Sequence, residues 1–100
     1  MTIDRDQVLA RLRDHEAELR RRGVLHAALF GSRARGDAGP DSDIDIMVDI
    51  EPERPMGLWE YAAVIEFIAD LFPIPVDVAE RKALKPLVRP AAERDAIYAF

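Results

Sequence analysis

The stretch GSRARGDAGPDSDID, residues 31–45, decides how this chain folds. Gly31-Ser32 directly follows the apolar run Val24–Phe30, and Asp43-Ile44-Asp45 begins a second apolar run that ends at Ile50. The first run is too short for a helix and almost continuously apolar, which is typical of a buried strand. The sequence therefore predicts a strand that ends in a glycine-serine turn, then a polar loop, then a neighbouring strand that presents two carboxylates.

The second strand is expected to separate acidic from apolar side chains. Side chains alternate along a strand, so Asp43 and Asp45 should point to one face with Cα atoms roughly 7 Å apart. The opposite face should carry a row of branched apolar side chains: Ile44, Ile46, Val48 and Ile50. Two carboxylates beside a glycine-serine turn suit a divalent cation and a phosphate.

The turn itself has the features of an anion site. The segment from Ser32 to Arg35 can form one helical turn, whose backbone N–H groups and Ser32 hydroxyl would face an anion. Gly31 allows the backbone to approach the ligand without a Cβ in the way. Arg33 and Arg35 are interpreted either as contacts to a phosphate or nucleotide, or as solvated charges.

Length and composition predict a single domain over residues 1–100. There is no cysteine, which leaves no disulfide framework and no thiolate metal site. No apolar run approaches the roughly 20 residues of a membrane span, and no signal peptide is recognisable, so no membrane partner and a cytoplasmic location are expected. The net charge of −5 argues against a long nucleic acid as the main partner.

Helices are expected on both sides of the central stretch. The first should run from about Arg5 to Arg22, with Asp4 and Gln7 forming a capping box. A second should run from about Met56 to Phe72. Its core-facing stripe is predicted to consist of Leu58, Tyr61, Ala62, Ile65, Ile68, Ala69 and Phe72. The opposite flank carries Trp59, Ala63 and Phe67, which form either a further packing surface within the domain or a partner site.

The remainder of the chain supplies a third strand and a third carboxylate. Ile74–Ala79 has the pattern of a strand in which Asp77 points away from Val76 and Val78. Asp77 would complete a metal cage with the first two aspartates, and Asp49 is the alternative, because it lies on the same strand face as they do. The tail should form one or two short helical turns, with a short edge strand from Ile97.

The segments GSRARG, SDIDIMV and VDV resemble the nucleotidyltransferase superfamily that includes DNA polymerase beta, and most closely its minimal nucleotidyltransferases. The resemblance implies an α/β fold with a small mixed sheet of three to four strands and helices packed on one face. Gly31 and Ser32 match the phosphate-loop positions of the family. Asp43 and Asp45 match its metal-binding pair, and Asp77 matches its third carboxylate.

The resemblance also implies a reaction, the transfer of a nucleoside monophosphate such as AMP from ATP to a hydroxyl. Two Mg²⁺ ions about 4 Å apart would stabilise the attacking and leaving oxygens. Asp43 and Asp45 would hold the metals, and Ser32 would contact the triphosphate. Asp77 would help to hold the metal that activates the hydroxyl and would accept its proton.

Small members of the superfamily are commonly the antitoxin partners of helical HEPN toxins, and some adenylylate the toxin. The chain is therefore expected to be a protein adenylyltransferase that acts on a HEPN-type partner. The alternatives are a non-catalytic antitoxin that neutralises its partner by binding, and the catalytic subunit of an antibiotic or RNA nucleotidyltransferase. A homo-oligomer or hetero-oligomer would form through Trp59 and Phe67.

Overall fold

The computed structural model describes residues 3–53 and 56–100 and contains a four-stranded mixed sheet with strand order β3-β2-β1-β4. The strands are β1 (Val24–Phe30), β2 (Ile44–Ile50), β3 (Val76–Glu80) and β4 (Ile97–Tyr98). β1 pairs antiparallel with β2 and with β4, whereas β2 and β3 run parallel. The predicted bounds of β1 and β2 are confirmed, and the predicted edge strand is present over Ile97–Tyr98. The third strand is shifted from the predicted Ile74–Ala79 to Val76–Glu80.

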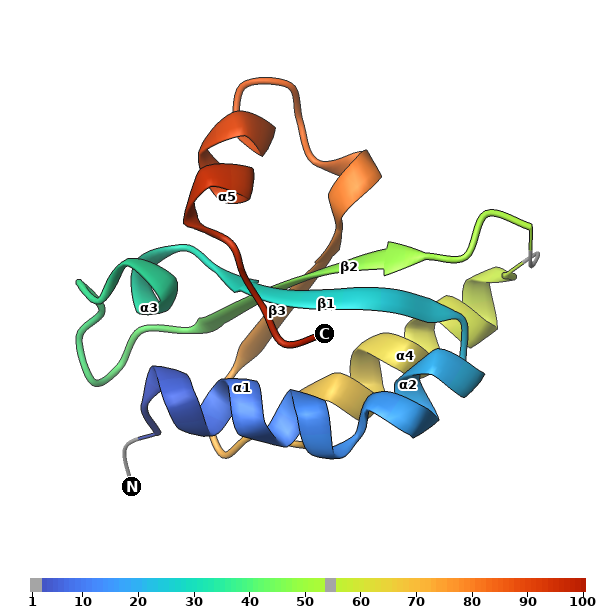
Figure 1. The fold of residues 1–100 in the computed structure, drawn as a ribbon, viewed down its shortest axis with the longest axis horizontal. Helices are drawn as coiled ribbons and strands as arrows, with labels where there is room; N and C mark the ends of the chain where they lie inside the picture. The colour runs from blue at the N-terminus through green and yellow to red at the C-terminus, as the bar shows by residue number, and fades with distance from the viewer. Residues whose placement is uncertain (1–2, 54–55) are drawn as a thin grey trace.

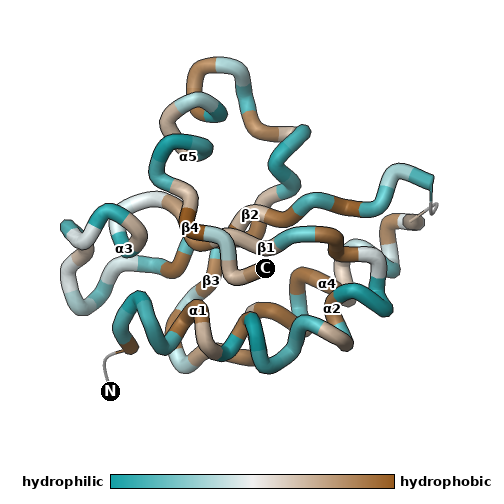
Figure 2. Tube along the Cα trace, viewed as in Figure 1, coloured by the Kyte–Doolittle hydropathy of each residue, from teal (hydrophilic) through white to brown (hydrophobic). Residues whose placement is uncertain are grey.

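Three of the helices cover one face of this sheet (Figure 1): α1 (Arg5–Asp14), α2 (Glu16–Arg21) and α4 (Leu58–Ala69). Their buried side chains meet the apolar row of β2 in the main core, where Leu12, Ile46 and Ile68 are fully buried. Figure 2 shows hydrophobic residues recurring along α1 and α4, as expected of helices that bury one side. The predicted α/β fold is confirmed.

The second face of the sheet is covered in part by α5 (Arg89–Asp95), which lies on the other side from α1 and α4 (Figure 1). Ala92 of α5 packs against Ala28 of β1 and Met47 of β2 in a smaller cluster. A short 3₁₀ helix, η1 (Arg81–Ala83), leads from β3 toward α5. The predicted helical turns of the tail are present, but the expectation that the helices pack on one face was wrong for α5, because Ala92 packs on the second face.

The first predicted helix is divided at His15 into α1 and α2, so the expectation of one helix from Arg5 to Arg22 was wrong. The His15 ring donates from Nδ1 to the Arg11 carbonyl at 2.8 Å, and its backbone N–H bonds to the Leu12 carbonyl at 3.2 Å. The Arg11 carbonyl is the partner that the backbone N–H of His15 would take in a regular helix. The side chain replaces that bond, and the helix bends there. The predicted Asp4–Gln7 capping box is present.

The predicted core face of α4 was also partly wrong. Leu58 is 77% exposed and Ala62 is exposed, whereas Val64 and Ile68 are buried. The helix is apolar on two sides, so its period alone could not select the buried side. α4 also ends at Ala69 rather than Phe72, because the next turn tightens into bonds between residues three apart, such as Leu71 N–H to the Ile68 carbonyl at 3.1 Å.

Candidate active site

The glycine-serine turn stands at the end of β1, where the chain enters the short helix α3 (Ser32–Arg35). Gly31 has φ 75° and ψ −156°, a backbone conformation that is essentially restricted to glycine. A Cβ on Gly31 would overlap the Oδ2 carboxylate oxygen of Asp45. The turn therefore lies directly against the carboxylate of Asp45, which is possible only without a side chain at position 31.

The pairing of the strands explains how the acidic residues meet. Asp45 lies opposite Phe30 at the end of β1 and beside Asp77 in the parallel pairing with β3. Asp43 precedes β2 by one residue and is exposed, as is Asp77, whereas Asp45 is half-buried. The structure thus brings together the turn and the three aspartates that the sequence analysis selected.

The negative charges of the other two aspartates act on Asp45. Burial raises the pKa of the Asp45 carboxyl, and the negative charges of Asp77 and Asp43 raise this pKa further. The positive charge of Arg35 acts in the opposite direction and lowers it. The ionised site therefore concentrates negative charge that a bound cation would stabilise.

Asp49, the alternative third carboxylate, lies elsewhere on β2. Arg81 donates from Nε to Asp49 Oδ1 at 2.6 Å, and the Asp49 side chain is 12% exposed. Its charge is therefore balanced by an arginine on η1. The register of β2 and β3 favours Asp77 as the third member of the acidic group.

Arg33 and Arg35, the two arginines of the turn segment, have different surroundings. Arg33 donates to the Ser42 carbonyl from Nη2 at 2.6 Å and from Nε at 3.0 Å, and to the Ile3 carbonyl from Nη1 at 2.9 Å. It fastens the loop before β2 to the start of the chain. These three hydrogen bonds give Arg33 a structural role. A contact between Arg33 and a nucleotide stays a prediction.

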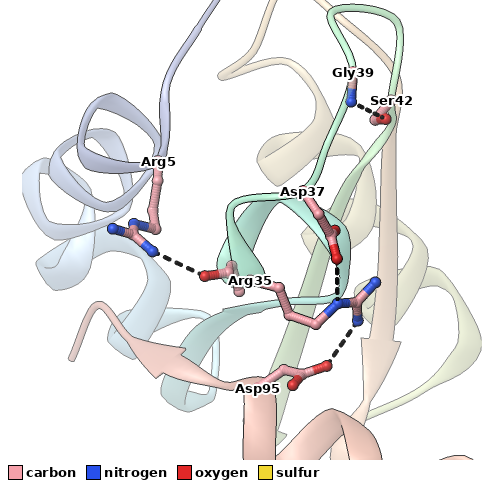
Figure 3. A network of polar contacts seen from close by, with 7 residues as sticks. Arg5, Arg35, Asp37, Gly39, Ser42 and Asp95 are labelled. Carbon is pink, nitrogen blue, oxygen red and sulfur yellow. Dashed lines mark hydrogen bonds and ion pairs between the residues drawn. The ribbon is translucent and has the colours of Figure 1, made fainter.

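Arg35 lies next to the acidic group and is held by two other carboxylates. It donates from Nε to Asp37 Oδ2 at 3.1 Å and from Nη1 to Asp95 Oδ2 at 2.8 Å (Figure 3). Asp37 belongs to the polar loop before β2, and neither Asp37 nor Asp95 was selected from the sequence as a site residue. No sequence pattern marks Asp95, because the contact joins residues sixty positions apart.

The donor set of the acidic group fits Mg²⁺, a hard cation that prefers oxygen ligands. Within the described ranges 3–53 and 56–100, no three His, Cys, Asp or Glu side chains are arranged so that they could hold a metal ion by themselves. Mg²⁺ is usually bound by one or two carboxylates together with substrate phosphates and water, rather than by a complete protein cage. The open arrangement of the aspartates suits a metal that arrives with a phosphorylated substrate.

The sequence and the fold are similar to those of known proteins. The model of the nucleotidyltransferase domain family matches residues 12–99. Protein adenylyltransferase MntA of Thermococcus cleftensis is 35% identical over 94 residues, which span 93% of each chain. A solved structure assigned as a minimal nucleotidyltransferase has a TM-score of 0.76 and 32% identity and covers 95% of each chain.

A more distant structure is a tri-AMPylated HEPN toxin of Shewanella oneidensis in complex with MNT antitoxin. It matches with a TM-score of 0.62 and 15% identity over 92% of this chain and 71% of the other, which shows a shared fold. With the family model covering most of its length, the chain belongs to the nucleotidyltransferase family. Among the described residues, no helix combines the length and the apolar character needed to cross a membrane.

Proposed function

We propose that this protein transfers AMP from ATP, with Mg²⁺, to a hydroxyl group on a protein partner, specifically a tyrosine of a HEPN-type toxin. The observation that carries the proposal is the strand register, which sets Asp45 against the Gly31 turn and beside Asp77. The name of the Thermococcus relative, a protein adenylyltransferase, supports AMP as the transferred group and a protein as the acceptor. The shared fold with the toxin-bound antitoxin supports the choice of partner.

The reaction assigns a task to each residue of the site. The backbone N–H groups after Gly31 and the Ser32 hydroxyl hold the triphosphate. The acceptor oxygen attacks the α-phosphorus, the bond from that phosphorus to the bridging oxygen breaks, and pyrophosphate leaves. Asp77 takes the proton of the hydroxyl. Its exposed position beside Asp45 leaves it accessible to an incoming acceptor.

Asp43, Asp45 and Asp77 would hold the metal. Mg²⁺, when bound, neutralises charge on the triphosphate and stabilises the attacking and leaving oxygens. The three carboxylates alone would repel a triphosphate, since like charges at close range raise the energy of the complex. Their contribution to substrate binding is therefore favourable only with the cation.

The first prediction is that triphosphate binding depends on a divalent cation. Binding of a non-hydrolysable ATP analogue, measured by calorimetry, should weaken at least about tenfold when Mg²⁺ is replaced by EDTA. Asp77→Asn should weaken the Mg²⁺-dependent binding, whereas Asp49→Asn should leave it unchanged because Asp49 is paired with Arg81. Equal affinity in EDTA would show that the aspartates do not act through a metal.

The acceptor must be positioned by a surface of the protein, because the attacking oxygen has to lie within about 3–3.5 Å of the α-phosphorus. Trp59 is 84% exposed and Leu58 is 77% exposed at the start of α4. Leu58 also lines an open hollow of about 400 Å³, together with residues that include Met56, Tyr61 and Glu80. We assign this surface to contact with the partner, since exposed Trp residues at such patches commonly dominate binding.

Phe67, which the sequence analysis grouped with Trp59, is a packing residue and not part of this surface. It packs against the main core, and its ring meets the His15 ring edge-on at a centroid distance of 5.9 Å. Arg22 lies over the same ring at 4.7 Å. Phe67 is therefore part of a packing surface within the domain, and we assign Trp59 to the partner site.

The second prediction is that Trp59→Ala weakens association with the toxin by about thirtyfold, the effect of losing an exposed aromatic anchor. The melting temperature should stay unchanged, because Trp59 has little packing to lose. Leu87→Ala is the matched control, since Leu87 is 96% exposed on the loop before α5. Equal affinity of both variants for the toxin, measured by calorimetry, would contradict this assignment, and loss of self-association alone would assign the surface to a second copy.

A further inference from the structure

Asp95, the last residue of α5, is paired with Arg35 of α3, the short helix that follows the Gly31 turn. Asp95 accepts a hydrogen bond from Arg35 Nη1 at 2.8 Å, and its side chain is 22% exposed. α5 is fixed on the sheet through Ala92, which is 4% exposed and packs with Ala28 and Met47. A residue on an anchored helix therefore holds the arginine whose positive charge acts on Asp45.

We propose that Asp95 is a positioning residue, which orients the Arg35 guanidinium so that its free N–H groups contact the bound triphosphate. This inference rests on the proposed function. A guanidinium carries five N–H donors in a fixed planar fork, so fixing two of its nitrogens fixes the direction of the remainder. Figure 3 shows Arg35 held at two nitrogens by Asp37 and Asp95, with the third nitrogen pointing away from both carboxylates.

The two carboxylates that hold Arg35 differ in how firmly they are placed. Asp37 is 61% exposed and lies two residues after Arg35 in a loop. Asp95 is less exposed and belongs to a helix that is packed on the sheet. Because a rigid partner restricts the arginine more than a mobile one, Asp95 should determine its orientation.

Positioning and charge have opposite consequences for binding. An exposed arginine loses side-chain entropy when it contacts a ligand, and pre-ordering by Asp95 removes part of that loss. The negative charge of Asp95 also offsets the positive charge of Arg35. This charge compensation by itself would weaken the attraction of Arg35 to a triphosphate. If positioning is the larger effect, removing Asp95 weakens binding; if charge compensation is larger, removing it strengthens binding.

The test is a double-mutant cycle that measures the Mg²⁺-dependent affinity for a non-hydrolysable ATP analogue by calorimetry. Asp95→Ala should weaken binding about fivefold to tenfold, the effect of ordering one long side chain. In the Arg35→Ala background the same substitution should have no effect, because Asp95 acts only through Arg35. Asp95→Asn keeps a hydrogen-bond acceptor and should lose less affinity than Asp95→Ala. If Asp95→Ala does not fold, the same cycle is measured with Asp95→Asn.

Glu93→Ala is the matched control, because Glu93 is an acidic residue on the same helix that pairs with Arg81 and Arg89 instead. It removes the same charge and should leave binding unchanged. The inference about Asp95 would be overturned, without affecting the proposed function, if Asp95→Ala bound the analogue equally well or more tightly. It would also be overturned if Asp95→Ala had the same effect with Arg35 present as in the Arg35→Ala background. Failure of the unsubstituted protein to bind the analogue would overturn the proposed function and this inference with it.

Discussion

Replacing Asp45 by asparagine should lower the rate of AMP transfer by roughly three orders of magnitude, which corresponds to about 4 kcal/mol of transition-state stabilisation. Asp45 is the point where the turn, β1 and β3 meet, since it lies opposite Phe30, beside Asp77 and against Gly31. An amide in its place removes the negative charge that a metal ligand needs. The rate is measured as pyrophosphate release in the presence of the partner.

The same substitution should leave the fold intact or slightly more stable. Burial and the charges of Asp77 and Asp43 raise the pKa of Asp45, so its ionised form destabilises the folded protein above that pKa. As the pH falls, the folded protein takes up this proton before the unfolded chain does, and the penalty disappears. In EDTA, Asp45→Asn should therefore melt at the same or a higher temperature near neutral pH, with an advantage that shrinks toward about pH 4.

Ile46→Ala provides the comparison for a structural residue on the same strand. Ile46 is fully buried in the main core, and its truncation should reduce the free energy of unfolding by about 2–5 kcal/mol. If Asp45→Asn lowered the melting temperature as much as Ile46→Ala does, Asp45 would be a structural residue. Its loss of activity would then carry no information on catalysis.

Gly31→Ala should reduce AMP transfer by about a hundredfold, the effect expected from displacing a catalytic group by about 1 Å. The new Cβ would overlap Asp45 Oδ2, and the carboxylate is the more mobile of the two, so Asp45 would move out of position. The backbone conformation of Gly31 adds a strain of about 1–3 kcal/mol in the free energy of unfolding. Both effects are measured on one preparation, by pyrophosphate release and by thermal melting.

Gly36→Ala separates the two effects. Gly36 also has a positive φ, 85°, but a Cβ there would have no neighbour within 4 Å. Gly36→Ala should lower the free energy of unfolding by about 1–2 kcal/mol and leave the rate of transfer nearly unchanged. If Gly31→Ala and Gly36→Ala lost activity equally, the loss would come from backbone strain and not from the contact between Gly31 and Asp45.

The sheet and the acidic group could be predicted from the sequence because local patterns specify them. Short apolar runs between glycines and aspartates predicted the bounds of β1 and β2, and side-chain alternation placed Asp45 on the face away from the main core. The third aspartate needed more than alternation, since Asp49 and Asp77 were both compatible with the pattern. The choice between them follows from the β2–β3 register and from the Arg81 contact to Asp49.

The features that could not be predicted depend on contacts between distant parts of the chain. The division between α1 and α2 results from one side-chain hydrogen bond of His15, and the buried side of α4 was ambiguous because both sides are apolar. The carbonyl contacts of Arg33 and the ion pair of Arg35 with Asp95 join elements that come together only in the folded protein.

Transfer of AMP to the partner is tested by the intact mass of the toxin after incubation with this protein, ATP and Mg²⁺. The toxin should gain the mass of one or more AMP groups, these groups should map to tyrosine, and Asp45→Asn should abolish the gain. A tight complex that inhibits the toxin while both chains keep their masses, even after long incubation, would contradict transfer to the toxin. That result would indicate a protein that neutralises its partner by binding alone.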